Sequence, residues 1–483
     1  MAPCSRPSSS SLLQGRRCRT PSHTSRVYTR PSRSSFFRAS SSSFQASTRN
    51  ETASGDTPPD LPVKQGASRF WIPIPAFLCL LFQPGTSRRT TRTELVKGQI
   101  WGFDQLQGVL NVLVNVRMTV VRMKNGNLLV YSPIAPTEEC LQLVRELGGE
   151  VEYIILPTTA LEHKIYFGPF ARKFPKAKAY AAPGQWSFPV PLPLSFLGLG
   201  FRRLDGTLTD EASDFPFADE FDLALLEAPL GIGPYVECAF YHKRSRTMLL
   251  VDAAVCVPNS PPTVARSPEN DRTLLIRARQ DVNDGASYLG GIVDDYDRAV
   301  DQVPRTDQKR QEGWWKTALF ALFFQPSDLD FDFVKAFVNQ SADSGFVWRD
   351  SYKSTFQNLS EKVIVAPILQ ALVFNKRPTT VANWVKKVSS WGFDKFIPCH
   401  FDAPVKATGR DIRLAFASFL DEDLADLGSP QLSSALDNVV PTRALRSSYN
   451  KDDMKILNTL DTIVVASGVV KLEKKQTTKG ANV

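Results

Sequence analysis

Four side chains of the sequence could together bind a metal ion: Glu162, His163, Asp252 and His400. Each follows a short apolar run that we expect to form a strand, so each should lie near the carboxyl end of a strand. Two imidazoles and two carboxylates suit Zn²⁺, iron or Mn²⁺. A metal ion there could lower the pKa of a bound water and polarise a substrate oxygen. The alternative is that each histidine is an ordinary hydrogen-bonded residue, which is the commoner case for a lone histidine after a strand.

Histidine is scarce in this sequence, so each one can be considered individually. The 483 residues include four histidines, and His23 lies in an N-terminal stretch that we exclude from the fold. His242 ends the apolar run Tyr235–His242 and precedes Lys243, so we expect it to face solvent. Glu237, five residues earlier on that strand, should face the opposite side.

The first metal-ligand candidates belong to a predicted strand–helix–strand unit. The apolar run Val151–Pro157 leads into a loop with Glu162 and His163, a helix-like stretch follows, and Ala177–Ala182 is a second apolar run. In such units, ligands gather at the carboxyl ends of the strands. Asp252 follows the predicted strand Thr247–Val251, and His400 follows Phe393–Cys399 in the same way.

Other patterns predict the elements around this unit. An Asn-Gly pair at Asn125–Gly126 between two apolar runs indicates a hairpin. Residues Pro136–Leu147 have helical spacing, with Thr137 as N-cap. Further predicted elements are a strand at Asp222–Ala228, helices around Ala286–Val303, Gly313–Phe324, Phe331–Asn339 and Thr355–Leu372, closing helices at Val381–Trp391 and Asp411–Leu420, and a helix near Lys451–Thr462 in a C-terminal tail.

The formal charge of +9 does not indicate a nucleic-acid partner. Residues 1–50 hold nine arginines and no lysine, aspartate or glutamate, so the remainder has 49 basic residues (58 − 9) and 49 acidic ones. A neutral body gives no reason to expect binding to a phosphate backbone. The stretch 1–60 is Ser- and Arg-rich, and its first 50 residues are free of acidic side chains. This composition is typical of a plastid transit peptide, which would place the protein in the chloroplast stroma; the alternative is a disordered basic tail.

The segment 61–96 is predicted to be a linker with a short apolar segment at residues 70–85. Its apolar run is shorter than the ~20 residues of a spanning helix and contains two prolines. We interpret it as a plug packed on the domain, with the core of a second targeting signal as the alternative. No transmembrane helix is expected, and peripheral membrane contact stays open. The seven cysteines form no CxxC pair, which fits a reducing compartment.

Several stretches together resemble the metallo-β-lactamase superfamily and, more closely, an uncharacterised plastid and bacterial family related to it, known as a domain of unknown function. They are GFDQLQGVLNV, NLLVYSPIAPT, LPTTALEHKIYFGPFARKFPKAKAYAAP, APGQWSFP, LLVDAAV and FIPCHFDAP. The resemblance implies an α/β fold, layered as an αββα sandwich. Its domain would comprise residues 97–258 and 380–420, with a helical insertion at 259–379 and an accessory tail at 421–483.

The resemblance also implies how the metal site differs from a two-metal one. The family signature His-x-His-x-Asp-His corresponds here to Thr158, Ala160, Glu162 and His163. A later histidine has no clear match, with Glu237 or His242 nearby; Asp252 matches a bridging aspartate and His400 the last histidine. The ligands of the first metal are thus missing, while those of the second are all present as Glu162, His163, Asp252 and His400.

The resemblance therefore implies a one-metal plastid protein with one Zn²⁺ or iron ion and no organic cofactor. If it is active, it would hydrolyse an ester, thioester or phosphoester, with Asp252 as metal ligand or as base for the water. The alternative is a non-catalytic protein that binds a small molecule or a protein partner through the apolar loop 184–203 and the insertion. The two histidines and Asp252 can share an ion only if their side chains lie within about 6 Å of one another. The oligomeric state is not predicted.

Overall fold

The computed structural model describes residues 67–71, 87–109, 112–185, 204–230, 233–280, 300–338, 342–420 and 449–468, together with 470 and 472. The predicted transit peptide, most of the apolar segment 70–85, most of the loop 184–203 and most of the predicted helix at 286–303 lie outside these residues. Within them, no helix is both long enough and apolar enough to cross a membrane.

The first sheet has seven strands whose spatial order follows the chain. β1 to β4 pair antiparallel, and β4 to β7 pair parallel. The strands are β1 (Thr91–Val96), β2 (Ile100–Val109), β3 (Val112–Arg122), β4 (Leu128–Tyr131), β5 (Val151–Leu156), β6 (Lys178–Ala181) and β7 (Gly206–Thr207). β1 lies in the stretch that the sequence assigned to a linker, so the sheet begins before residue 97.

The predicted local elements of this sheet are confirmed. β3 and β4 form the hairpin, and Gly126 in its turn has a φ of +86°. α2 (Glu138–Arg145) begins after Thr137, whose hydroxyl accepts a hydrogen bond from the backbone N–H of Cys140. β5, α3 (Leu161–Lys173) and β6 form the strand–helix–strand unit, with β5 and β6 parallel.

The second sheet has five strands in the order β16-β15-β10-β9-β8. β8 (Phe221–Leu230) and β9 (Gly233–His242) form a long antiparallel pair, whereas β10 (Thr247–Leu249) pairs parallel with β15 (Lys395–Ile397). β16 (Val405–Lys406) completes the edge. β15 reaches this sheet from far along the chain, after the insertion, and brings His400 with it.

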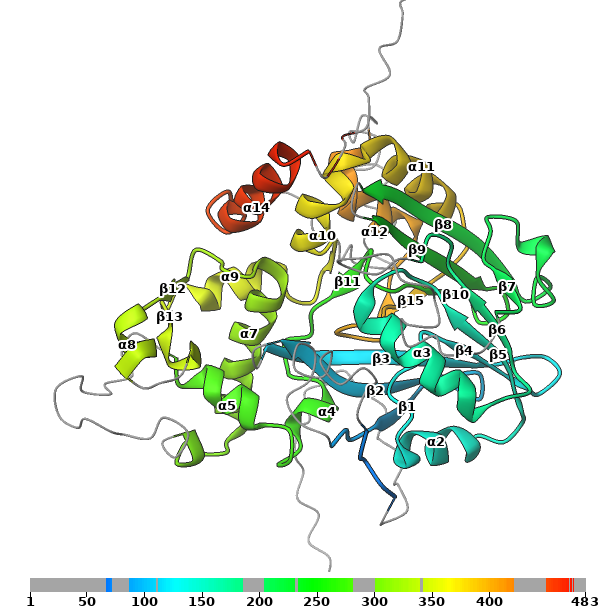
Figure 1. Ribbon diagram of the computed structural model, residues 1–483, viewed down its shortest axis with the longest axis horizontal. Coiled ribbons are helices and arrows are strands. Elements are labelled where there is room, and N and C mark those ends of the chain that lie inside the picture. The colour runs from blue at the N-terminus through cyan, green and yellow to red at the C-terminus, as the bar shows by residue number, and fades with distance from the viewer. Residues whose placement is uncertain are drawn as a thin grey trace, which may run out of the picture. The chain divides into compact units, whose positions relative to one another are not determined.

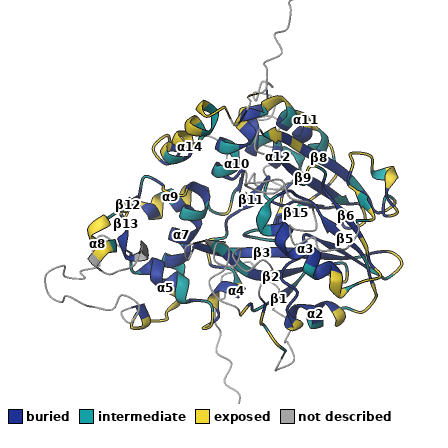
Figure 2. Cartoon of the chain, viewed as in Figure 1, coloured by how far each residue is buried: buried dark blue, intermediate teal, exposed yellow. Residues whose placement is uncertain are grey.

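Three apolar layers hold the sheets and helices together. Between the two sheets, Tyr131, Phe240 and Ile397 belong to one buried cluster. The outer face of the first sheet is covered by α2 and α3, and the outer face of the second by α11 (Pro378–Ser389) and α12 (Gly409–Ala415). Figure 1 shows the helices on these two outer faces, and Figure 2 shows that the strands between them are largely buried. The predicted αββα sandwich of the α/β class is confirmed.

The stretch predicted as a helical insertion contains helices but also short strands. The helix expected at Thr355–Leu372 is wrong as one element: α9 (Tyr352–Leu359) ends, β14 (Val363–Ile364) pairs with β11 (Val255–Cys256), and α10 (Pro367–Leu372) follows. Pro367 at the first turn of α10 cannot continue a helix from the preceding residues. The other elements are α4 (Thr263–Arg266), α5 (Arg272–Ala278), α7 (Asp307–Phe323), β12 (Leu329–Phe331), α8 (Phe333–Val338) and β13 (Phe346–Trp348).

The insertion shares a core with the sandwich, since Trp314 and Leu319 of α7 belong to a buried cluster that also includes Phe401. The helix expected in the tail is confirmed as α14 (Lys455–Ala466), which packs beside α10.

Candidate metal centre

Three of the four predicted ligands come together at one edge of the sandwich. His163, Asp252 and His400 each offer a ligand atom, and these atoms lie within 4.8 Å of one another. Nε2 of His400 is 3.3 Å from Oδ1 of Asp252, and Nε2 of His163 is 3.7 Å from Oδ2. Two ligands bound to a tetrahedral ion at about 2.0–2.1 Å lie roughly 3.4 Å apart. The spacing therefore allows all three to share one ion, with small adjustments.

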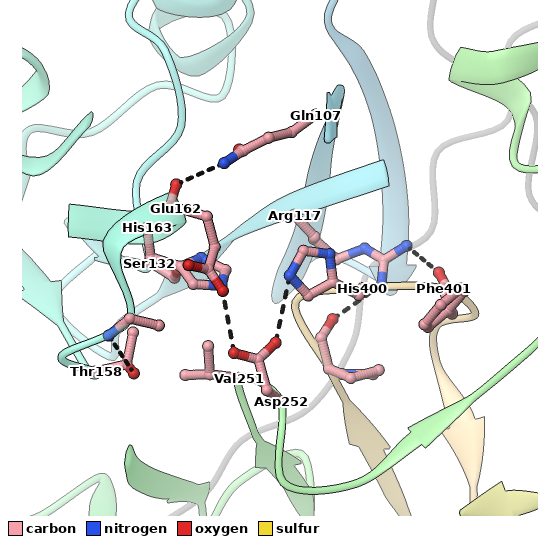
Figure 3. Close-up of polar contacts among 12 residues, drawn as sticks. Gln107, Arg117, Ser132, Thr158, Glu162, His163, Val251, Asp252, His400 and Phe401 are labelled. Atoms are coloured by element: carbon pink, nitrogen blue, oxygen red, sulfur yellow. Dashed lines mark hydrogen bonds and ion pairs between the residues drawn. The ribbon is translucent and has the colours of Figure 1, made fainter. Parts of the chain in front are cut away.

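Each ligand comes from a different part of the chain, as Figure 3 shows. Asp252 follows β10, and His400 follows β15, as expected. The expected loop at Glu162–His163 is wrong, because both residues lie in the first turn of α3. The Thr158 hydroxyl accepts a hydrogen bond from Ala160 N–H, which turns the chain into the helix at Leu161. An acidic residue in the first turn, here Glu162, also favours a helix N-terminus.

Glu162 does not belong to the cluster. Its backbone carbonyl accepts a hydrogen bond from Gln107 Nε2 at 3.0 Å. Its carboxylate acts on the site through its charge, which favours the protonated forms of both His163 and His400. The four-ligand arrangement implied by the resemblance is thus a three-residue cluster in this structure.

His163 is completely buried and is oriented by Ser132. Ser132 Oγ lies 2.9 Å from Nδ1, while Nε2 has no hydrogen-bond partner among the described residues. A buried ring nitrogen without a partner is costly unless something else binds it. The orphaned atom points into the cluster, which fits a metal ligand. Ser132 was not predicted, although it directly follows the strand β4 and so stands at a strand end like the ligands.

His400 is oriented by β3 of the other sheet. Its Nδ1 lies 2.8 Å from the backbone carbonyl of Asn115. Because a carbonyl oxygen can only accept, Nδ1 carries the proton, and in the neutral ring Nε2 presents a lone pair towards Asp252. Burial lowers the pKa of His400, which favours this neutral form. Outer-shell bonds of this kind hold metal-binding imidazoles in the required tautomer.

Asp252 lies between the two imidazoles and stays ionised. Burial by itself would raise the pKa of its carboxyl group, but His163 and His400 outweigh that effect and lower it. Conversely, burial would lower the pKa of His163, but the Asp252 carboxylate raises it. Asp252 therefore supplies one negative charge at the centre of the cluster.

Glu237 is one of the two residues near the position where the resemblance expects a later histidine. Its Oε1 accepts the N–H of Val251, and its Oε2 accepts the N–H groups of Asp252 and Ala253, all at 2.8–3.0 Å. The Tyr235 hydroxyl also donates to Oε2 at 2.7 Å. Burial, and next the charge of Asp252, raise the pKa of Glu237 to about 7. Its oxygens hold the backbone that carries Asp252, and Glu237 is not part of the ligand cluster.

The other candidate, His242, lies away from the cluster, and its predicted solvent exposure is wrong. The side chain is fully buried, packs against the Phe221 ring at 5.0 Å and bonds Ser245 Oγ through Nδ1 at 2.6 Å. Burial lowers its pKa to about 4, so the ring is neutral. Lys243 indicated a surface turn, but the inward side of the strand at His242 faces the core.

Thr158 and Ala160, the two positions where the resemblance expects imidazoles, supply no metal ligand. Thr158 is buried and forms a backbone bridge with Glu237, while its hydroxyl accepts the N–H of Ala160. The following Thr159 is tied to the same strand, with its hydroxyl donating to the carbonyl of Pro234 at 2.9 Å. This segment serves as a structural junction between α3 and β9.

The fold and the site define the class of protein: an αββα sandwich with two histidines and an aspartate clustered at the ends of its elements. The chain belongs to the family described as Domain of unknown function (DUF4336), whose profile matches residues 97–418. The match runs through the insertion without interruption, and it confirms the resemblance to a family of unknown function. No curated protein sequence matches the chain.

Several solved structures are similar. One is the metal-soaked Flv1 flavodiiron core from Synechocystis sp. PCC6803, with 9% identity and a TM-score of 0.35 over 70% of this chain and 62% of that one. The chain thus spans less than two thirds of that core's length. Another is a metallo-beta-lactamase from Pontibacter korlensis, with 12% identity and a TM-score of 0.27 over 40% of this chain and 86% of that one.

Proposed function

We propose that the protein binds one metal ion, Zn²⁺ or iron, through His163, Asp252 and His400, and that it hydrolyses an ester, thioester or phosphoester. The observation that carries the proposal is the convergence of the two Nε2 atoms on Asp252, with each Nδ1 occupied by an orienting partner. Two imidazoles and one carboxylate form a ligand set that suits both metals and leaves coordination positions open.

The residues would divide the work as follows. His163 and His400 would hold the ion with neutral nitrogens, since their other ring nitrogens are already bonded. Asp252 has one oxygen towards each imidazole, so it would serve as a ligand of the ion or as the base for the water. A bound ion would supply a lowered water pKa and polarisation of the substrate oxygen. Glu237 would keep Asp252 in place through the three backbone N–H groups it accepts.

Elemental analysis of protein expressed with added zinc and iron tests the metal site. We expect about one ion per chain in the wild type and a large loss in His400→Gln. His242→Gln is the matched control, because it removes a buried imidazole that is not part of the cluster, and it should leave the metal content unchanged. A wild type without stoichiometric metal, or a His400→Gln variant that keeps it, would refute the proposal.

A second candidate is a non-catalytic protein that binds a small ligand or a partner. It is favoured by Thr158 and Ala160, which stand where the resemblance expects imidazoles and bring no ligand to the site. Metal-loaded wild type that cleaves no ester, thioester or phosphoester would favour this function. Localisation in the chloroplast stroma stays a prediction from the composition of residues 1–60.

A further inference from the structure

The loop Pro398–Phe401, which carries His400, follows a strand of the second sheet but is fixed by a strand of the first. The Arg117 backbone N–H donates to the carbonyl of Cys399 at 2.6 Å. Its guanidinium donates to the carbonyls of Pro398 and Phe401, both at 2.9 Å. Asn115 accepts the N–H of Phe401 with Oδ1 at 2.9 Å and donates to the Phe401 carbonyl with Nδ2 at 3.1 Å. β3 thus bonds backbone groups on both sides of His400, as Figure 3 shows for Arg117 and Phe401.

A third residue, Asp104 on β2, holds the two side chains that make these bonds. Asp104 lies opposite Arg117 in the β2–β3 register. Its Oδ1 is 3.1 Å from Arg117 Nη2 and accepts a hydrogen bond from Asn115 Nδ2 at 2.8 Å. We name Asp104, Asn115 and Arg117 the His400 clamp. Its members are 8%, 0% and 4% exposed.

Stability alone is a weak explanation for such a cluster. A buried ion pair is often no more stabilising than apolar residues of similar volume, and its desolvation is costly. Apolar side chains at these positions of the β2–β3 pair would avoid this desolvation cost. The side chains do fulfil a geometric need, because Phe401 has a φ of +62°, in the left-handed region that non-glycine residues rarely adopt. Strained residues of this kind persist where the surrounding structure holds them, often at functional sites.

We propose that Asp104, Asn115 and Arg117 are positioning residues that fix the direction of His400 towards Asp252 and so set the metal affinity of the site. The proposal rests on the metal site proposed above. The clamp acts through the backbone of the loop, since its side chains bond Pro398 and Phe401 and are not members of the ligand cluster. Loss of an outer-shell partner typically lowers metal affinity by roughly 10–100-fold, and the clamp should have an effect of that size.

The first experiment measures Co²⁺ affinity by its visible absorption in the wild type and in Arg117→Ala. We expect Arg117→Ala to weaken binding by roughly 10–100-fold. A cavity of about 120 Å³, lined in part by Asp104, Arg117 and Phe401, adjoins the position of the missing guanidinium. Millimolar guanidinium added to the solution should therefore restore much of the affinity. A general loss of folding would not respond to guanidinium in this way.

Arg92→Ala is the matched control. Arg92 is also a buried arginine of the first sheet, but it donates to the carbonyl of Leu143 at 2.6 Å and pairs with Glu146. We expect its removal to leave Co²⁺ affinity unchanged, with no effect of guanidinium. Arg117→Lys is the variant to use if Arg117→Ala does not fold. It keeps the positive charge beside Asp104 but loses the paired hydrogen bonds to the carbonyls of Pro398 and Phe401. Arg117→Lys should also weaken Co²⁺ binding, but less than Arg117→Ala does.

A second readout needs no metal. Cys399 lies in the clamped loop and is 1% exposed, while Cys140 in α2 is also buried and serves as an internal reference. Mass spectrometry after timed alkylation should show faster labelling of Cys399 in Arg117→Ala and no change at Cys140. Unchanged labelling of Cys399 overturns the clamp, as does unchanged Co²⁺ affinity in a wild type that binds the ion. A wild type without Co²⁺ binding refutes the metal site, and Cys399 labelling then still decides whether the clamp holds the loop.

Discussion

His163 and His242 are two buried histidines with nearly the same surroundings and different chemistry. Both are 0% exposed, and each Nδ1 is bonded to a serine hydroxyl, Ser132 in one case and Ser245 in the other. In the part of the chain that the structure describes, each Nε2 lacks a hydrogen-bond partner, and each faces a carboxylate, Asp252 at 3.7 Å and Glu220 at 4.0 Å.

The difference lies in what surrounds each carboxylate. Asp252 has His400 on its other side, and the two rings lower its pKa. Glu220 instead uses both oxygens to accept the backbone N–H of Lys124, at 2.9 and 3.1 Å. Burial and next the charge of Arg244 lower the pKa of His242 to about 4, whereas Asp252 raises that of His163. A buried histidine beside a carboxylate thus occurs both at the candidate metal centre and away from it, and the second converging imidazole, His400, distinguishes the candidate centre.

The largest difference between the surroundings of His163 and those of His242 should appear in metal affinity when each neighbouring carboxylate is replaced by an amide. Asp252→Asn removes the central negative charge and one good oxygen ligand. We expect metal affinity to fall by more than the roughly 10–100-fold cost of losing an outer-shell partner. Glu220→Gln should leave it unchanged. Isothermal titration with Zn²⁺ measures the affinity of both variants; equal affinities would contradict the assignment of the metal to the cluster around Asp252.

The pH dependence of stability should report on His242. An unfolded histidine has a pKa of ~6.5, and that of folded His242 is about 4. Above pH ~6.5 both states are neutral and the buried ring costs nothing; as the pH falls towards 4, only the unfolded chain takes up the proton, which lowers the free energy of unfolding by up to about 3 kcal/mol.

His242→Gln removes this titration. Urea unfolding of the wild type and of this variant measures the effect. As the pH falls from ~7 to ~4.5, the free energy of unfolding of the wild type should decrease relative to that of the variant. Other groups titrate in the same range but are common to both proteins. A difference that stays constant with pH would show that His242 is not held neutral.

The smallest effects should come from the two serines. Ser132→Ala leaves His163 free to rotate and should weaken metal binding by roughly 10-fold. Ser245→Ala should leave the metal affinity unchanged and cost about 1–3 kcal/mol of stability, because its hydroxyl bonds both His242 Nδ1 and Thr247 Oγ1. Metal titration and urea unfolding of both variants separate the two results. If Ser245→Ala weakened metal binding as much as Ser132→Ala, the two histidines would not differ as the structure indicates.

Much of this site was predictable because position along a strand is a local property. Apolar runs followed by a polar residue indicated that Asp252 and His400 lie just after strands, as they do. The same reasoning placed His163 in the loop after β5, whereas it lies in the first turn of α3. The structure brings these three together. Ser132 follows β4 in the same pattern and could have been found by the same reasoning. Glu162 and His242 could not be decided in this way, because burial and side-chain direction depend on elements distant in sequence.

The sequence by itself determined the strand–helix–strand unit, the hairpin, the N-cap at Thr137 and the order of the ligand candidates. Periodicity and turn residues act over a few positions, so they can be read without the fold. Only the tertiary structure decided which histidine contributes to the cluster, because that depends on where two sheets meet. His400 lies beside Asp252 since β10 and β15 pair in parallel, and it is held by Asn115 and Arg117, about 280 residues earlier in the chain.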